Sequence, residues 1–284
     1  MSESEHVSSD APLLAAQAVA AVNDIGAREQ AFWDEHVPGL EHCLREYEAG
    51  PDANTSAMLD ALEPVRGRRV LDFACGPGVT SVWLAQRGAI VTALDISPAS
   101  IERARRLADR TGLAIEFIAA ELRSDTFPPG SFDAIAGRYA LHHVDLTVIA
   151  PIFDAILVPG GVGGFVETMG LNPLLNLSRR RLAGRAGVAS YGSEDERPLT
   201  GTDLRVLESE IGPVRLTTGR MEFLRIFDRN VLRHRHPRAS TVLGSIDDAL
   251  SRAGLTRLSY HQVVTVLKQP ALAGPAGPDR VAAR

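Results

Sequence analysis

One stretch of the chain, residues 69–95, constrains the possible fold more than any other. It begins with a short apolar run that has the length and composition of a buried strand. The run stops at a turn dense in glycine and proline, Cys75–Gly76–Pro77–Gly78, after which a helical pattern closes near Gly88. A second apolar run then ends in an acid, Asp95. A strand, a glycine turn, a helix and a second strand of this kind begin a doubly wound α/β sheet.

The residues around this turn suit contact with a nucleoside. Gly76 and Gly78 let the backbone approach a ligand where a Cβ atom would clash. Asp95, at the tip of the neighbouring strand, can accept hydrogen bonds from both hydroxyls of a ribose. A nicotinamide dinucleotide pattern would require a third glycine where this chain has Ser81, and it has no use for an acid at Asp72. An NAD-binding module therefore remains only as the less favoured alternative.

Four separately spaced motifs between about Arg69 and Glu167 resemble those of the class I S-adenosylmethionine-dependent methyltransferases. The first is the acid and glycine turn described above, in which Ala74 replaces the first glycine of the family's pattern. The segment after the predicted fourth strand, residues 138–145, is similar to that of the ubiquinone/menaquinone-type branch (methyltransferase type 11), which acts on small molecules. The other two are an acid followed by the run into strand four and a turn before strand five: Glu121–Leu122 with residues 127–133, and Pro159–Gly160–Gly161.

The resemblance implies a fold, a cofactor and the residues that bind it. The fold is α/β, a doubly wound seven-stranded sheet whose last strand is antiparallel, with an N-terminal helical lid and an insertion after strand five. The cofactor is S-adenosylmethionine. Glu121 would accept from the adenine amino group, the backbone of Leu122 would read the ring edge, and Arg138 would contact the cofactor through its backbone. The full cofactor-binding set is Asp72, Ala74, Gly76, Gly78, Asp95, Ile96, Glu121, Leu122 and Arg138.

Histidine at the carboxyl end of the predicted fourth strand could act as a general base, because its pKa lies near working pH. We name His143 as the candidate; helix capping or core packing remains the ordinary alternative for it and for His142. The candidate substrate or lid residues are Trp33, Tyr47, Tyr139 and Arg181. Ordinary packing remains open for the aromatic residues of the lid, and a solvated helix face for the arginine.

The pattern divides the chain into a tail (1–12), a helical lid (13–63), the cofactor-binding core (64–169), a substrate-covering insertion (170–201), the C-terminal part of the core (202–270) and a second tail (271–284). Within these segments the pattern predicts one helix over Ala31–Tyr47, a helix over Thr202–Ile211 capped by Thr202 or Asp203, and a strand over Val214–Phe223. It further predicts a helix over Ser245–Ala253 and a last strand over Leu255–Lys268, whose apolar part is Tyr260–Leu267.

Composition excludes several classes of function. The net charge of −5 argues against an electrostatic nucleic-acid binder. No apolar run reaches the roughly 18 residues needed to cross a bilayer. The two cysteines give no disulfide framework, and the acidic, polar N-terminus lacks the blocks of a signal peptide, so we expect a cytoplasmic protein. No histidine or cysteine spacing predicts a metal site.

The sequence therefore predicts an S-adenosylmethionine-dependent methyltransferase acting on a small molecule of secondary metabolism, with oxygen as the favoured acceptor atom. Methylation of carbon or nitrogen, and a cyclisation on the same fold, remain alternatives. Substrate identity and oligomeric state are left open.

Overall fold

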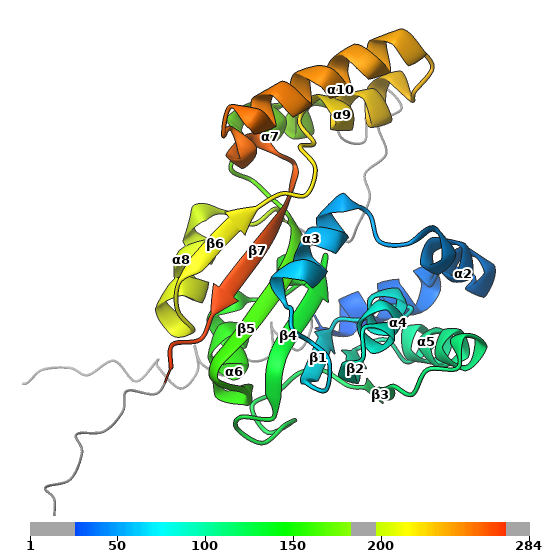
Figure 1. The fold of residues 1–284 in the computed structure, drawn as a ribbon, viewed down its shortest axis with the longest axis vertical. Helices are drawn as coiled ribbons and strands as arrows, with labels where there is room; N and C mark the ends of the chain where they lie inside the picture. Colours follow the sequence, from blue (N-terminus) through cyan, green and yellow to red (C-terminus); the bar gives the residue numbers. More distant parts are fainter. Residues whose placement is uncertain (1–25, 183–196, 271–284) are drawn as a thin grey trace, which may run out of the picture.

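The computed structural model describes residues 26–182 and 197–270 of the 284-residue chain (Figure 1). Its centre is one seven-stranded sheet in the order β3-β2-β1-β4-β5-β7-β6, in which β1 to β5 are parallel and β7 is antiparallel to both of its neighbours. The predicted fold class is therefore confirmed. The strands are β1 Arg69–Phe73, β2 Ile90–Asp95, β3 Glu116–Ala119, β4 Phe132–Arg138, β5 Leu157–Thr168, β6 Val214–Thr217 and β7 His261–Leu267.

Helices cover both faces of the sheet, and each face has its own apolar cluster (Figure 1). Successive residues of β1 alternate between the two: Val70 packs in the cluster beneath α3, α4 and α5, and Leu71 in the one beneath α6 and α8. Residues 26–36 are helical and precede α2. The labelled helices are α2 Leu40–Ala49, α3 Ala53–Ala61, α4 Val79–Gln86, α5 Pro98–Thr111, η1 Leu141–His143, α6 Leu146–Ile156, α7 Pro173–Leu182, α8 Gly201–Glu210, α9 Leu224–Phe227, η2 Asp228–Leu232, α10 Pro237–Arg252 and η3 Thr256–Leu258.

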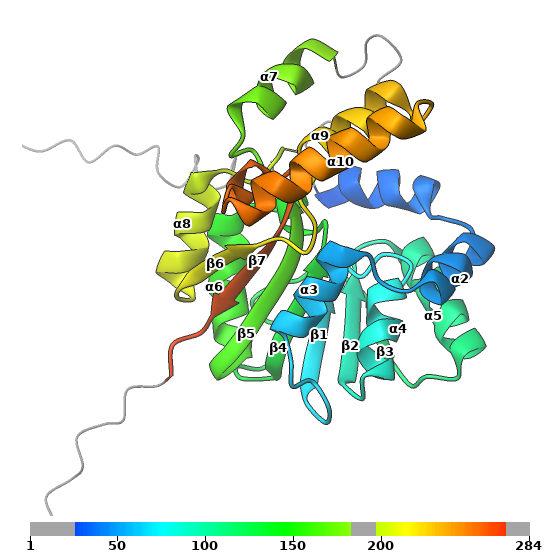
Figure 2. The same ribbon diagram turned by 45° about the horizontal axis from the view of Figure 1, so that its top comes forward.

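The strand order reverses between β1 and β4, where ligands of doubly wound sheets bind. The carboxyl ends of the parallel strands lie at the same edge as the first residue of β7, because β7 runs the opposite way. Beyond this edge stand α7, α9 and α10, with α9 beside α10 (Figures 1 and 2). The two outermost strands, β3 and β6, have only four residues each. On β3, the guanidinium of Arg105 donates a hydrogen bond of 3.0 Å to the carbonyl oxygen of Phe117.

The single N-terminal helix predicted over Ala31–Tyr47 is wrong. The first helix ends at His36, residues 37–39 are not helical, and α2 begins at Leu40. Pro38 has no backbone N–H to continue the ladder of hydrogen bonds, so the chain bends there and can turn two short helices onto different parts of the core. Helix α3, by contrast, packs directly on the sheet, with Met58 and Leu59 fully buried.

The strand predicted over Val214–Phe223 is also too long, because β6 ends at Thr217. The next residues form a turn that is held by Asn54 of α3. The side-chain oxygen of Asn54 accepts a hydrogen bond from the Thr218 hydroxyl at 3.0 Å, and it accepts from the amides of Gly219 and Arg220 at 2.9 and 3.2 Å. These contacts hold residues 218–220 in a turn, so the strand ends there although the apolar pattern continues.

Three further boundaries in the C-terminal part differ from the sequence expectation. Helix α8 is capped by Thr200, which forms a capping box with Asp203, rather than by Thr202 or Asp203. Helix α10 begins at Pro237 instead of Ser245, with proline in the first turn where its missing N–H costs nothing. The last strand is shorter than Leu255–Lys268, because η3 comes first and β7 starts at His261. Among the described residues no helix is both long and apolar enough to span a bilayer.

Candidate functional site

The two glycines of the turn after β1 have different physical roles. Both adopt left-handed backbone conformations, with φ of +52° at Gly76 and +81° at Gly78. A Cβ on Gly78 would lie 2.7 Å from the Cβ of Ala104, so this glycine allows the start of α4 to approach α5. A Cβ on Gly76 would meet nothing within 4 Å. Gly76 therefore borders open space at the sheet edge, while Gly78 serves packing.

Ala74, at the position of the family's first glycine, has a left-handed backbone conformation. Its φ is +51°, which a residue with a Cβ adopts only at a cost of about 1–2 kcal/mol. Tyr139, directly after β4, is also left-handed, with φ of +58°. The two strained residues follow neighbouring strands, β1 and β4, at the edge where the strand order reverses. Such strain is concentrated at functional sites.

Asp95 ends β2 with its carboxylate held by two backbone amides. One oxygen accepts from the N–H of Gly76 at 2.8 Å, and the other from the N–H of Ser97 at 2.9 Å. The residue is only 7% exposed, and burial raises the pKa of its carboxyl group, against the opposing effect of the two amides. Each carboxylate oxygen has a further lone pair to offer, so this fixed group can still accept hydrogen bonds from ligand hydroxyls.

Asp72 lies beneath the turn instead of facing it. It is 1% exposed, and one of its oxygens accepts a hydrogen bond of 2.5 Å from the Ser81 hydroxyl on α4. Burial raises the pKa of this carboxyl group to about 7. The hydrogen bond ties β1 to the first turns of α4, and so the direct effect of Asp72 is on the shape of the glycine turn.

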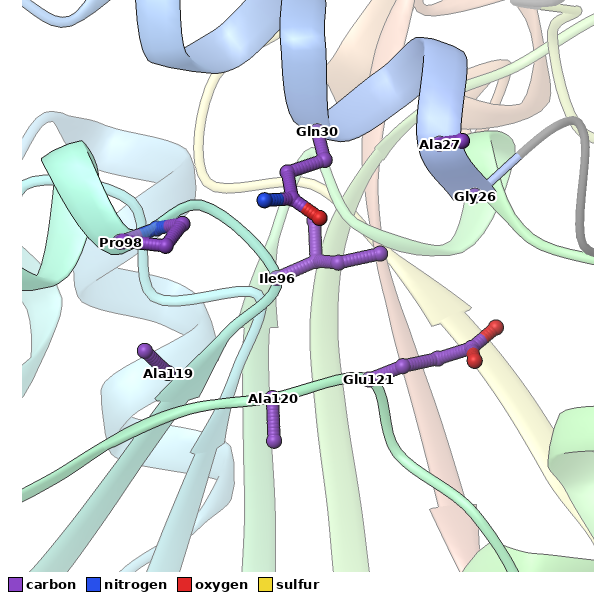
Figure 3. Close-up of a pocket in the computed structure, with 8 residues that line it drawn as sticks. All are labelled: Gly26, Ala27, Gln30, Ile96, Pro98, Ala119, Ala120 and Glu121. Atoms are coloured by element: carbon purple, nitrogen blue, oxygen red, sulfur yellow. The ribbon is translucent and has the colours of Figure 1, made fainter.

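A cavity of about 320 Å³ lies beyond the tips of β2 and β3 (Figure 3). Ile96 and Glu121, both predicted as cofactor-binding, line it together, and the side chain of Gln30 points into it from the first helix. The Glu121 carboxylate is partly exposed and lies 3.6 Å from the Arg123 guanidinium. Sequence motifs gave no signal for the residues of the first helix that complete the lining. The eight lining residues are Gly26, Ala27, Gln30, Ile96, Pro98, Ala119, Ala120 and Glu121.

The helix over residues 26–36 is fastened above this cavity at two points. At one, Asp34 accepts hydrogen bonds from the Ser97 hydroxyl (2.6 Å) and the Ala99 amide (3.2 Å), at the start of α5. At the other, Glu29 accepts from the indole N–H of Trp33 at 3.0 Å and lies 3.1 Å from Nδ1 of His143. The ring centroids of Trp33 and His143 are 5.6 Å apart, edge to face. The structure thus brings together the predicted lid tryptophan and the predicted base.

His142 is held more rigidly than its neighbour. Its Nδ1 lies 2.7 Å from a carboxylate oxygen of Glu167, the last residue but one of β5, which is fully buried. The other oxygen of Glu167 accepts from the amides of Ala140 and Leu141 at 2.9 and 2.7 Å, which fixes the start of η1. A carboxylate on Nδ1 favours the tautomer that leaves Nε2 as the proton acceptor. No sequence motif indicates this role of Glu167.

Two further predicted residues, Arg138 and Tyr47, contact Trp83 of α4. The Arg138 guanidinium pairs with Glu46 of α2 at 2.6 Å and lies 5.6 Å from the centre of the Trp83 ring. Tyr47 packs with the apolar cluster of α3, α4 and α5, and its carbonyl oxygen accepts from the Trp83 indole at 3.4 Å.

Tyr139 stacks edge to face on His261, the first residue of β7, with 5.1 Å between the ring centroids. Burial raises the pKa of the Tyr139 hydroxyl. Leu122 is buried in the cluster beneath α6. Arg181 falls within α7, but its side chain lies outside the described part of the structure. No group of three or more metal-binding side chains occurs among the described residues.

Comparison with known proteins agrees with this geometry. Residues 70–161 match the family described as "Methyltransferase domain". A ubiquinone biosynthesis O-methyltransferase of Methylocella silvestris is 37% identical over 103 residues, which are 36% of this chain and 40% of that protein. An uncharacterised methyltransferase of Mycobacterium tuberculosis is 36% identical over 107 residues, 37% of this chain and 53% of that protein. The chain thus spans about half, or less, of the length of these relatives.

Solved structures share the fold across a larger part of the chain. A geranyl diphosphate methyltransferase in complex with S-adenosylmethionine superposes with a TM-score of 0.52 at 18% identity, covering 82% of this chain and 90% of the other. The cyclase SpnF gives the same TM-score at 18% identity, covering 76% and 80%. The glycine turn, the two acids, the sheet order and the matched family all agree, and residues 70–161 are a methyltransferase domain of the class I S-adenosylmethionine-dependent family.

Proposed function

We propose that this protein transfers a methyl group from S-adenosylmethionine to a small-molecule acceptor of secondary metabolism, with oxygen as the favoured acceptor atom. The observation that carries the proposal is the cavity beyond β2 and β3: Ile96 in its lining directly follows Asp95, whose fixed carboxylate accepts from the amide of Gly76 in the glycine turn. A nucleoside needs these features in this order: an apolar slot for the base, an acceptor for the ribose hydroxyls and a close backbone approach.

The residues present fit the nucleoside half of this cofactor. Asp95 would hold the ribose hydroxyls, because its two amide contacts already fix the orientation of its carboxylate. Ile96 would cover one face of the adenine, and Glu121, in the same cavity, would accept from the exocyclic amine. Gly76 would let the ligand pass close to the turn. When bound, S-adenosylmethionine supplies a methyl group on a sulfonium centre, whose leaving group is neutral.

Because that leaving group is neutral, the protein's task is to place the acceptor, exclude water and remove a proton where the acceptor has one. Two histidines are available for the proton. His142 is oriented by a hydrogen bond with Glu167 from within the sheet, whereas Nδ1 of His143 lies 3.1 Å from the carboxylate of Glu29 on the first helix. We favour His142 as the base, since its carboxylate partner is fully buried and fixed by two further hydrogen bonds. His143, the candidate from the sequence, is the alternative.

The small-molecule acceptor is supported by what covers the site. Helices stand over the sheet edge from two sides: residues 26–36 from one, and α7, α9 and α10 from the other (Figure 2). One protein similar to this chain is named for the biosynthesis of ubiquinone, and another for geranyl diphosphate. Both ubiquinone and geranyl diphosphate are small molecules. The chain also lacks the Asn/Asp–Pro–Pro–aromatic segment after β4 that would suit an exocyclic amine of a nucleic-acid base.

Calorimetric titration with S-adenosylhomocysteine tests the cofactor assignment. Asp95→Asn should weaken binding by about 1–3 kcal/mol, because the charge-assisted hydrogen bonds to the ribose are lost. Asp109→Asn is the matched control, since it makes the same change at an exposed position of α5. Equal affinity of both variants and the native protein would contradict the assignment, and so would tight binding of NAD in place of S-adenosylhomocysteine.

Turnover with methyl-labelled cofactor and a panel of phenols and alcohols tests the reaction and the base. If His142 removes the proton, His142→Gln should reduce the rate on alcohols by about 100-fold or more, and His143→Gln by much less. The reverse order would assign the base to His143. A product that carries no label would favour a cyclisation over methyl transfer.

A further inference from the structure

We propose that Arg138 and Glu46 together form the receptor for the charged amino-acid end of the cofactor, with Arg138 taking the carboxylate and Glu46 the ammonium group. This inference rests on the function proposed above. The family resemblance implied only a backbone contact from Arg138 and gave no part to Glu46, so both side-chain roles come from the structure.

The order of the strands places the two residues at the correct end of the ligand. The base cavity lies beyond β3 and β2, the ribose acceptor Asp95 ends β2, and the turn containing Gly76 follows β1. The next strand in the sheet is β4, and Arg138 is its last residue. A nucleoside that lies along this edge with its base beyond β3 therefore directs its 5′ substituent toward Arg138.

The Arg138 side chain also contacts the helix that begins directly after the glycine turn. Its charge lowers the pKa of Asp72, the carboxyl group beneath the turn, against the larger effect of burial. The guanidinium lies 5.6 Å from the centre of the Trp83 ring on α4, the helix that begins directly after the turn. Arg138 is thus held between the end of β4, α2 and α4.

The Arg138–Glu46 pair has the burial and the charges that a zwitterion requires. The guanidinium and carboxylate are 2.6 Å apart, and their side chains are 19% and 31% exposed. Partly buried charges cost more to desolvate than surface ones, so they need partners of opposite sign. The amino-acid end of the cofactor carries an ammonium and a carboxylate on one carbon. One arginine and one glutamate in contact can pair with both of its charges, and in the free protein they satisfy each other.

In the alternative, purely structural role, the same ion pair only holds α2 against β4, as a strut does, and does not contact the ligand. The two roles differ in which ligand they affect. S-adenosylhomocysteine carries the amino acid, and 5′-methylthioadenosine has the same nucleoside thioether without it. A receptor for the zwitterion acts only on the first ligand, whereas a strut that shapes the nucleoside site acts on both.

The experiment is calorimetric titration of both ligands into the native protein, Glu46→Gln and Arg138→Gln. Each substitution should weaken S-adenosylhomocysteine at least tenfold and change the affinity for 5′-methylthioadenosine less than twofold, and the second result also shows that the variant is folded. Glu41→Gln is the matched control, because Glu41 makes an exposed contact of 3.9 Å from the same helix to Arg110. It should leave both affinities unchanged.

Equal losses for the two ligands, or no loss for either, would overturn the inference and leave the proposed function standing. Failure of the native protein to bind either ligand would overturn the proposed function, and the inference with it.

Discussion

The two glycines after β1 allow packing and ligand contact to be separated by substitution. Gly76→Ala and Gly78→Ala both force alanine into a left-handed conformation, at a cost of about 1–2 kcal/mol each. Only at Gly78 does the new Cβ meet a neighbour, 2.7 Å from the Cβ and 3.1 Å from the Cα of Ala104. Such overpacking adds about 1–3 kcal/mol. We therefore expect stability losses of roughly 1–2 kcal/mol for Gly76→Ala and roughly 2–5 kcal/mol for Gly78→Ala.

Urea denaturation measures these free energies of unfolding, provided that the dependence on urea concentration has the same slope in each variant. Titration with S-adenosylhomocysteine measures the loss of ligand affinity. The alanine methyl at position 76 would enter the space reserved for the ligand, so Gly76→Ala should have the larger loss of affinity per unit of lost stability. Ala104→Gly provides the internal control. It removes the atom that clashes with the new methyl at position 78, so the Gly78→Ala/Ala104→Gly pair should show a favourable coupling of about 1–3 kcal/mol.

Two results would refute this reasoning. Equal destabilisation by the two substitutions would mean that the contact between α4 and α5 at Gly78 is not tight. Additivity of Gly78→Ala and Ala104→Gly would mean that the methyl groups do not meet.

Three further predictions concern single residues of the same edge. Because burial raises the pKa of Asp72 from 3.8 to about 7, the folded protein retains a proton that the unfolded chain releases, so this residue should lower the free energy of unfolding between about pH 4 and pH 7. The Asp72 contribution should reach ~4 kcal/mol, from roughly three pKa units at about 1.4 kcal/mol each, and Asp72→Asn should flatten the pH dependence by that amount in urea denaturation at a series of pH values. Ala74→Gly should raise the free energy of unfolding by up to about 1 kcal/mol, since relief of the left-handed strain exceeds the added freedom of the unfolded chain; a decrease would refute this. Asp34→Ala should release the first helix from Ser97 and the start of α5, measured as faster hydrogen exchange over residues 26–36 and weaker binding of S-adenosylhomocysteine; unchanged exchange would show that the helix is fastened elsewhere.

The core of the fold could be predicted because its signals are local. The strand, turn and helix over residues 69–95 each depend on neighbouring residues, and Asp95 is placed by the end of its own strand. The cap of α5 is local too: Ser97 accepts from the amide of Ser100, three residues along the chain. Boundaries in the C-terminal part were less predictable. There, contacts distant in sequence decide where an element ends, as Asn54 does for β6.

The same limit explains what was missed at the site. Glu167 orients His142 from 25 residues away along the chain, and no spacing rule connects the two. Glu46 and Arg138 are farther apart still, and their pairing depends on how α2 docks after the bend at Pro38. The lining residues contributed by the first helix carry no motif, because backbone and small side chains can cover a base without any particular identity.

The shortness of β3 and β6 bears on how copies of this protein can meet. An outer strand with unpaired backbone groups is a template on which another chain can add, and this leads to fibrous aggregation. Here each outer strand has only four residues, and on β3 the carbonyl oxygen of Phe117 already accepts a hydrogen bond from the Arg105 guanidinium. Backbone pairing between molecules is therefore discouraged at both ends of the sheet, and self-association of this domain would have to use its helical surfaces.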